Sequence, residues 1–93
     1  MRFVWDENKN KANRKKHGID FQDAALVFND DNRIEFYDES HSEDEDRYDT
    51  IGLVEDVLFV VYTERGQLTR IISARIATPK ERSLYYGRDL FDL

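Results

Sequence analysis

Two long apolar runs in the C-terminal half of the chain constrain the fold more than any other feature. They are "VLFVVYTE", residues 57–64, and "LTRIISARI", residues 68–76, and only "RGQ" separates them. β-Branched and aromatic residues favour strands, and a short connection containing glycine is typical of a hairpin. The sequence therefore predicts an antiparallel hairpin.

Alternation along this hairpin predicts two different faces, because residues paired across a hairpin share a face. We expect one face to be the core, covered by two helices from the N-terminal part of the chain. It comprises Val57, Phe59, Val61, Leu68, Ile72, Ala74 and Ile76. The other face is half polar and suits an open groove. It comprises Leu58, Val60, Tyr62, Thr69, Ile71, Ser73 and Arg75.

Capping signals predict three helices. Asp6 can cap a helix over about residues 7–16, with Gly18 just past its end, and Asp20 can cap a second helix in "FQDAALVF". A third helix begins with a capping box and an N1 proline, formed by Thr78, Pro79 and Glu81.

Three shorter strands complete the expected architecture: "RFVW", "RIEFYD" and "RYDTIGLV", the last with Gly52 as a candidate bulge. "ESHSEDED" between the second and third reads as a polar loop. The order β-α-α-β-β-β-β-α predicts an α+β fold with an antiparallel sheet, formed by one domain over residues 1–93.

Charge is distributed unevenly along the chain. Residues 20–56 hold fourteen Asp or Glu and two Lys or Arg, although the whole chain has a formal net charge of only −6. The basic ends suit an anion such as nucleic acid, and the acidic middle suits either solvent or a basic protein partner. The chain has no cysteine, no apolar run long enough for a membrane span and no signal-peptide pattern. We expect a cytoplasmic protein that does not enter a membrane.

Arg75 is the most informative charged residue, since a mid-sheet arginine needs an anion or a carboxylate. Two alternatives remain open from the pattern, a phosphate ligand and a structural ion pair with one of the many acids. Arg70 and Arg65 lie nearer the turn, where long side chains can reach solvent.

The first and last predicted helices carry further candidates. His17 follows a lysine-rich stretch that includes Lys16, and it suits either proton transfer or capping of the helix end. Arg82 can pair with phosphate, and Tyr85 or Tyr86 can stack on a base or pack against the sheet. His41 has no apparent partner in the sequence.

No metal or nucleotide motif is present. The two histidines lack metal-ligand spacing, the acids of "EDED" are consecutive rather than alternating, and there is no P-loop, GxGxxG or GxSxG. Any catalysis is therefore expected to use Arg, Lys, His or Tyr, with no metal and no cofactor.

Taken together, several segments resemble the BrnT family of type II toxins. They are "WDENKNKANRKKHGIDFQDAALVF", a single Arg47 before a strand, "VVYTERG", "RIISARIAT" and "ERSLYY", and the resemblance covers about residues 3–86. The chain departs from the family in having Asp46 where a glutamate usually precedes the arginine, and in its overall acidity.

The resemblance implies a RelE-like ribonuclease toxin that cleaves RNA and blocks translation. It also implies a BrnA-type antitoxin with a ribbon-helix-helix part, a heterotetramer with that antitoxin, and contact with operator DNA only through it. The positions that match the family are Lys16, His17, Arg47, Arg65, Arg70, Arg75, Glu81 and Tyr85.

On this basis we expect cleavage by the 2′-OH of the RNA, giving a 2′,3′-cyclic phosphate. The expected catalytic residues are His17, Arg47, Arg75 and Tyr85, and the expected RNA-binding residues are Lys16, Arg65, Arg70 and Arg82. Two alternatives remain: a catalytically inactive module that binds an antitoxin, and a nucleic-acid binder that grips phosphate with its basic ends.

Overall fold

The computed structural model describes residues 1–91, and the side chains of residues 1–87. Its helices are α1 (Glu7–His17), α2 (Phe21–Ala24) and α3 (Pro79–Phe91), with 3-10 turns η1 (Ala25–Asn29) and η2 (Glu39–His41). Its strands are β1 (Arg2–Val4), β2 (Ile34–Tyr37), β3 (Arg47–Val54), β4 (Asp56–Arg65) and β5 (Leu68–Ile76). These elements confirm the predicted α+β class.

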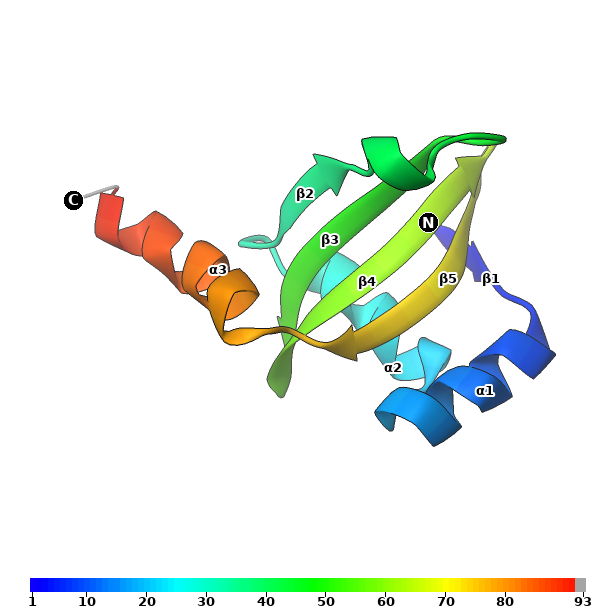
Figure 1. Ribbon diagram of the computed structural model, residues 1–93, viewed down its shortest axis with the longest axis horizontal. Coiled ribbons are helices and arrows are strands. Elements are labelled where there is room, and N and C mark those ends of the chain that lie inside the picture. Colours follow the sequence, from blue (N-terminus) through cyan, green and yellow to red (C-terminus); the bar gives the residue numbers. More distant parts are fainter. Residues whose placement is uncertain (92–93) are drawn as a thin grey trace.

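The five strands form one sheet in the order β1-β5-β4-β3-β2. Strands β2 to β5 pair antiparallel with their neighbours, whereas β1 pairs parallel with β5. The prediction of an antiparallel sheet was therefore wrong for β1. In the sequence, α1 and α2 lie between β1 and the other four strands. Strand β1 forms one edge of the sheet and runs in the same direction as its neighbour β5 (Figure 1).

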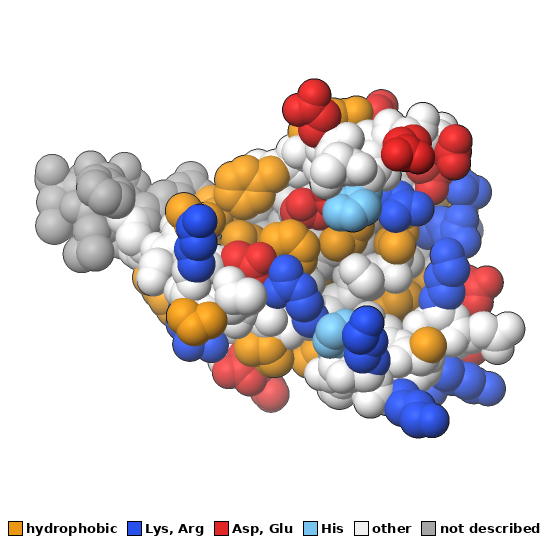
Figure 2. All heavy atoms as spheres, viewed as in Figure 1, with side chains coloured by type: hydrophobic (Ala, Val, Ile, Leu, Met, Phe, Trp, Pro, Cys, Tyr) orange, Lys and Arg blue, Asp and Glu red, His pale blue; other side chains and the backbone are white. Residues whose placement is uncertain are grey.

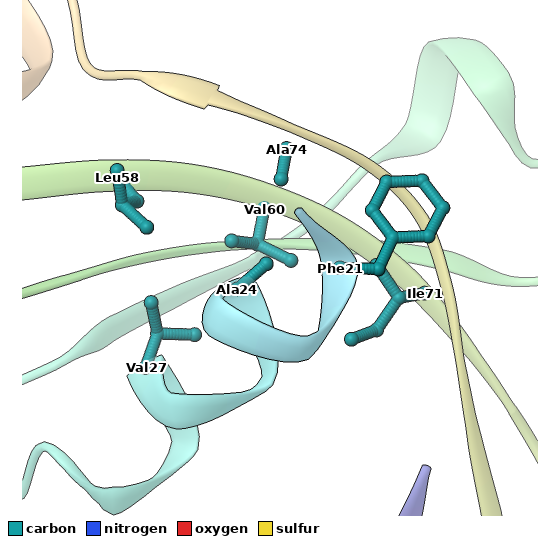
Figure 3. Close-up of a cluster of buried hydrophobic side chains, with 7 residues drawn as sticks. All are labelled: Phe21, Ala24, Val27, Leu58, Val60, Ile71 and Ala74. Carbon is teal, nitrogen blue, oxygen red and sulfur yellow. The ribbon is translucent and has the colours of Figure 1, made fainter. Parts of the chain in front are cut away.

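One face of the sheet is covered by α2 and η1 (Figure 1). Their buried side chains pack on β4 and β5 in a single cluster of Phe21, Ala24, Val27, Leu58, Val60, Ile71 and Ala74 (Figure 3). The predicted second helix is thus two elements, since the α-helix ends at Ala24 and the chain continues as a 3-10 turn.

The predicted core face of the hairpin was wrong for β4 and for the half of β5 next to the turn, where Ile71 is in the core and Ile72 lies on the opposite face. A β-bulge separates that half of β5 from Ala74, which was predicted correctly. Near the turn, Tyr62 pairs with Ile71, but one step further Val61 pairs with Ser73, so Ile72 is an extra residue in β5. Because side chains alternate with a period of two, one inserted residue exchanges the faces. Leu58, Val60 and Tyr62 therefore share the helix-covered face with Ala74, and Val57, Phe59 and Val61 share the opposite face with Arg75.

Helix α1 is attached through amide groups rather than an apolar stripe. Its buried residues are Asn10 and Asn13. The Asn13 side chain donates to the Ala74 carbonyl at 2.8 Å and accepts from the Ala74 N–H at 3.1 Å, while Asn10 accepts from the Phe21 N–H at 2.9 Å. Strand β1 pairs with β5 only as far as Arg70, so Asn13 satisfies backbone groups that lie beyond it. Helix α1 therefore flanks the edge of β5.

Gly52 is not the predicted bulge, because β3 and β4 pair without interruption around it. At this position η1 lies close against the sheet. A Cβ atom built at Gly52 would lie 3.1 Å from Cβ of Val27 and 3.3 Å from the Val27 carbonyl oxygen. The glycine therefore permits a close contact between two layers.

The C-terminal helix α3 projects from the end of the sheet (Figure 1). Tyr85 joins it to β3 and β4 in a second buried cluster with Ile51, Val57 and Ala77. Its capping box is confirmed: Thr78 N–H donates to Glu81 Oε1 at 2.8 Å, and Glu81 N–H donates to Thr78 Oγ1 at 3.2 Å.

Candidate functional site

The face of the sheet opposite α2 carries a groove of about 400 Å³. Its floor is formed by β3, β4 and β5, and η2 with the residue before it forms one rim. Among the residues that line it are Asp38, His41, Arg47, Asp49, Phe59, Ser73 and Arg75. We call this feature the sheet groove.

A second, shallower hollow adjoins the sheet groove at Ile72 and Ser73. Its opposite side is formed by α1 and includes Lys9, Lys16 and His17. Figure 2 shows this face of the molecule, with the two histidines of the chain both visible on it and basic side chains along one end. The two hollows therefore form one continuous surface between η2 and α1.

Arg75 lies in the sheet groove on the face predicted to be open. Its guanidinium donates to both carboxylate oxygens of Glu81, at 2.7 and 2.9 Å, and lies 4.2 Å from the ring centroid of Phe59. The hydrogen bonds to Glu81 raise the pKa of Arg75, and the same bonds lower the pKa of Glu81. The ion pair thus holds the arginine in one orientation, and a guanidinium with five N–H donors retains donors for an anion.

Arg47 reaches the same groove from β3, although it is far from Arg75 in sequence. Its Nε is buried and has no hydrogen-bond partner within the described part of the chain. A buried donor without a partner is costly, so a ligand that accepts from it gains free energy. The structure therefore brings together in one groove the two arginines that we predicted to be catalytic.

A carboxylate pair lies beside these arginines. Asp38 accepts from His41 Nδ1 at 3.0 Å and from Ser40 Oγ at 3.1 Å. Burial, with a hydrogen bond to Asp38 and its negative charge, raises the pKa of Asp49 to about 6. For Asp38, burial acts in the same direction, but hydrogen bonds from His41, Asp49 and Ser40 outweigh it and lower the pKa. Asp49 therefore takes up a proton as the pH falls through about 6, while Asp38 stays ionised at that pH.

The structure does not bring the other predicted residues to the sheet groove. Arg65 pairs with Glu45 at 3.0 Å at the far end of the hairpin, and Arg70 lies opposite Thr63. Arg82 is exposed on α3. Tyr85 is only 7% exposed, and its hydroxyl donates to Asp30, so its position fits packing of α3 rather than stacking on a base.

Three groove residues were missed by the sequence reasoning: Asp38, His41 and Asp49. The expectation that His41 has no partner was wrong. The polar segment forms a 3-10 turn, which brings the His41 side chain into contact with Asp38, three residues earlier in the sequence. That spacing was the available signal, together with Asp49 lying two residues after Arg47 on one face of a strand.

Within the described residues, no group of three or more His, Asp or Glu side chains is arranged to hold a metal ion. Across the same residues, no helix is long and apolar enough to cross a membrane.

The fold and the groove define a small α+β protein that presents arginine, histidine and carboxylate groups together on an open sheet face. Residues 5–81 match the family described as "Ribonuclease toxin, BrnT, of type II toxin-antitoxin system", so the chain belongs to that family. Membership implies an antitoxin partner. A search of curated proteins finds no match to the chain.

Proposed function

We propose that the chain is a metal-independent endoribonuclease with a RelE-like arrangement, which blocks translation by cleaving RNA. The observation that carries the proposal is the convergence of Arg47 and Arg75 in one groove beside groups that can exchange protons. Two fixed guanidinium groups match the charge that develops on the phosphorane when a 2′-OH attacks the adjacent phosphate.

In this scheme Arg75 stabilises the phosphorane, with Glu81 fixing its direction, and Arg47 binds a neighbouring phosphate oxygen through Nε. Lys16 and His17 lie where the RNA strand would continue toward α1, and His17 takes part in proton transfer. Arg65, Arg70 and Arg82 would contact RNA outside the groove, through charge alone. Tyr85 contributes indirectly by holding α3, which carries Glu81.

The partner in this proposal is a BrnA-type antitoxin with a ribbon-helix-helix part, which forms a heterotetramer with the toxin. The toxin contacts operator DNA only through this antitoxin. The acidic segment 38–46 contributes Asp38 and His41 to one rim of the groove, so a basic antitoxin segment bound along it would block access. Translation takes place in the cytoplasm, which is where we place the protein.

The direct test is cleavage of RNA by the purified chain in EDTA, with products examined for 2′,3′-cyclic phosphate ends. We expect activity to persist under chelation and to fall by at least about 10²-fold in Arg47→Ala, since a preorganised donor of this kind contributes about that much. Arg2→Ala is a matched control, because Arg2 is exposed on β1 and outside both hollows. Loss of cleavage in EDTA would contradict the metal-independent scheme.

One observation favours a second function. Glu81 already neutralises Arg75, as in a structural ion pair, and this suits a catalytically inactive module that only binds its antitoxin. Such a module would bind the antitoxin tightly, and neither the wild type nor Arg47→Ala would shorten RNA when expressed in cells.

A further inference from the structure

The His41 side chain stands at the rim of the sheet groove in a defined orientation. It is 66% exposed, whereas the Asp38 carboxylate beneath it is 12% exposed. Its Nδ1 lies 3.0 and 3.1 Å from the two Asp38 oxygens, and it lines both the groove and the neighbouring hollow on the acidic side. The ring is therefore anchored at one nitrogen and open at the other.

The anchoring decides which nitrogen can act as a base. An ionised carboxylate only accepts hydrogen bonds, so Nδ1 carries the proton that it donates to Asp38. In the neutral ring, Nε2 then bears the free lone pair. Asp38 also faces the positive charge that appears when Nε2 takes a proton, and this stabilises the imidazolium.

We propose that His41, positioned by Asp38, is the general base that removes the 2′-OH proton of RNA bound at Arg47 and Arg75. This inference rests on the ribonuclease function proposed above and assigns the proton acceptor that it left open. Asp38 is a positioning residue, since it acts through His41.

The reaction balances without a further reactant. The 2′-OH proton moves to His41 Nε2, the 2′ oxygen forms a bond to phosphorus, and the bond between phosphorus and the 5′ oxygen breaks. The departing 5′ oxygen receives one proton, and the products are a 2′,3′-cyclic phosphate and a 5′-hydroxyl. His41 returns its proton to water.

His17 is the candidate that supplies the proton to the leaving oxygen. It is the last residue of α1 and lines the hollow that adjoins the sheet groove. It approaches from the side of α1, while His41 approaches from η2. Two histidines on opposite sides of one surface suit a reaction in which one proton leaves and another arrives.

Other charged side chains lie around His41. Its own segment contributes the carboxylates of Asp38, Glu43, Asp44 and Glu45. The strands beneath contribute Arg47, Asp49 and Arg75. Because a substitution can alter these charges, the pH profile of each variant is compared with that of the wild type.

The test uses two oligoribonucleotides of the same sequence, one ordinary and one with a sulfur atom replacing the leaving 5′ oxygen at one linkage. A thiolate leaves without being protonated, so this substrate needs a base but no acid. For His41→Ala we expect a loss in kcat of about 10²–10⁴-fold on both substrates, and for His17→Ala a loss on the ordinary substrate only.

Asp38→Asn should resemble His41→Ala, with a loss in kcat on both substrates and an altered pH profile, because an amide can donate to Nδ1 and favour the wrong tautomer. Glu39→Gln is the matched control, since Glu39 lies in the same turn, is exposed and lines neither hollow. It should cleave at the wild-type rate.

The outcomes separate the two proposals. Wild-type cleavage with an equally active, folded His41→Ala would overturn the role of His41 and leave the ribonuclease function standing. Recovery of His41→Ala on the sulfur substrate would overturn its role as the base. No cleavage by the wild type would overturn the ribonuclease function and this inference with it. His41→Gln, which is close in size and polarity, is interpreted by the same criteria if the alanine variant fails to fold.

Discussion

Replacing Asp49 with asparagine should stabilise the protein at neutral pH and not at acidic pH. In the folded chain the pKa of Asp49 is raised from 3.8 to about 6, chiefly by burial and then by the hydrogen bond to Asp38 and its charge. An asparagine can donate to Asp38 as the protonated acid does, and it never ionises. The variant therefore keeps the favourable contact and loses the charge.

The magnitude follows from the two pKa values. At about 1.4 kcal/mol per pH unit, the difference between 3.8 and about 6 sets an upper limit of about 3 kcal/mol. Asp49 is only partly buried, so solvent screening reduces the expected effect to roughly 1–2 kcal/mol. Because the folded pKa is raised, the wild type holds this stability below about pH 3.8 and loses it as the pH rises through about 6.

Denaturant unfolding at about pH 4.5 and about pH 7.5 measures the effect as the difference between variant and wild type. Other acids, including Asp30 and Glu81, have lowered pKa values, so their contribution to the stability of the protein is lost at low pH instead. These acids are present in both proteins, so their contributions cancel in the difference. Asp31→Asn is the control, since Asp31 is exposed and makes no side-chain hydrogen bond among those found in the described chain. An equal gain at both pH values, or none at pH 7.5, would refute the reasoning.

Three further substitutions test the packing that positions the site. Asn13→Ala should lower the free energy of unfolding by about 2–4 kcal/mol, since it leaves buried backbone groups without partners; urea unfolding measures this. Gly52→Ala should cost about 1–3 kcal/mol, because its Cβ would lie 3.1 Å from Cβ of Val27; a thermal melt that matches the wild type would contradict it. Tyr85→Phe should cost about 1–3 kcal/mol through the lost hydrogen bond to Asp30 while RNA cleavage is retained, and equal stability with lost cleavage would instead place the hydroxyl at the site.

Local signals in the sequence were sufficient for most elements and for the α+β class. Asp6 accepts from the Lys9 N–H as a helix cap, and Gly18 ends α1 with a positive φ of 74°, both as expected from residue type alone. Such features depend on neighbours in sequence. For the same reason the hairpin and the capping box of α3 were predictable.

Which residues of β4 and β5 share a face of the sheet was not predictable, because it depends on one extra residue in β5. Nothing in "RIISAR" distinguishes a regular strand from one with Ile72 bulged, yet the bulge decides whether Arg75 lies across from Phe59 or from Leu58. The prediction that Arg75 and Ser73 share a half-open face was correct, but the other residues expected on that face, such as Val60 and Ile71, belong to the buried core. Non-local pairing of this kind becomes visible only when the two strands are placed together.

The partners of charged groups were the other feature that the sequence could not supply. Arg75 had many acids available, and only the geometry of the β5–α3 connection selects Glu81. His41 lies among acids in a segment that the sequence indicated to be a solvated loop. Its position in the groove depends on β3, which places Arg47 and Asp49 beneath η2. The candidate base was therefore hidden in the part of the chain with the least regular pattern.

The acidic balance of the whole chain does not describe the groove. A formal net charge of −6 opposes the approach of RNA at long range, and salt screens that repulsion. Inside the groove, Glu81 is paired with Arg75 and Asp38 accepts a hydrogen bond from His41. A phosphate bound there can accept hydrogen bonds from the N–H donors of Arg47 and Arg75. An acidic chain can thus keep a phosphate-binding site, because the charges that decide binding are those within a few ångströms of the phosphate.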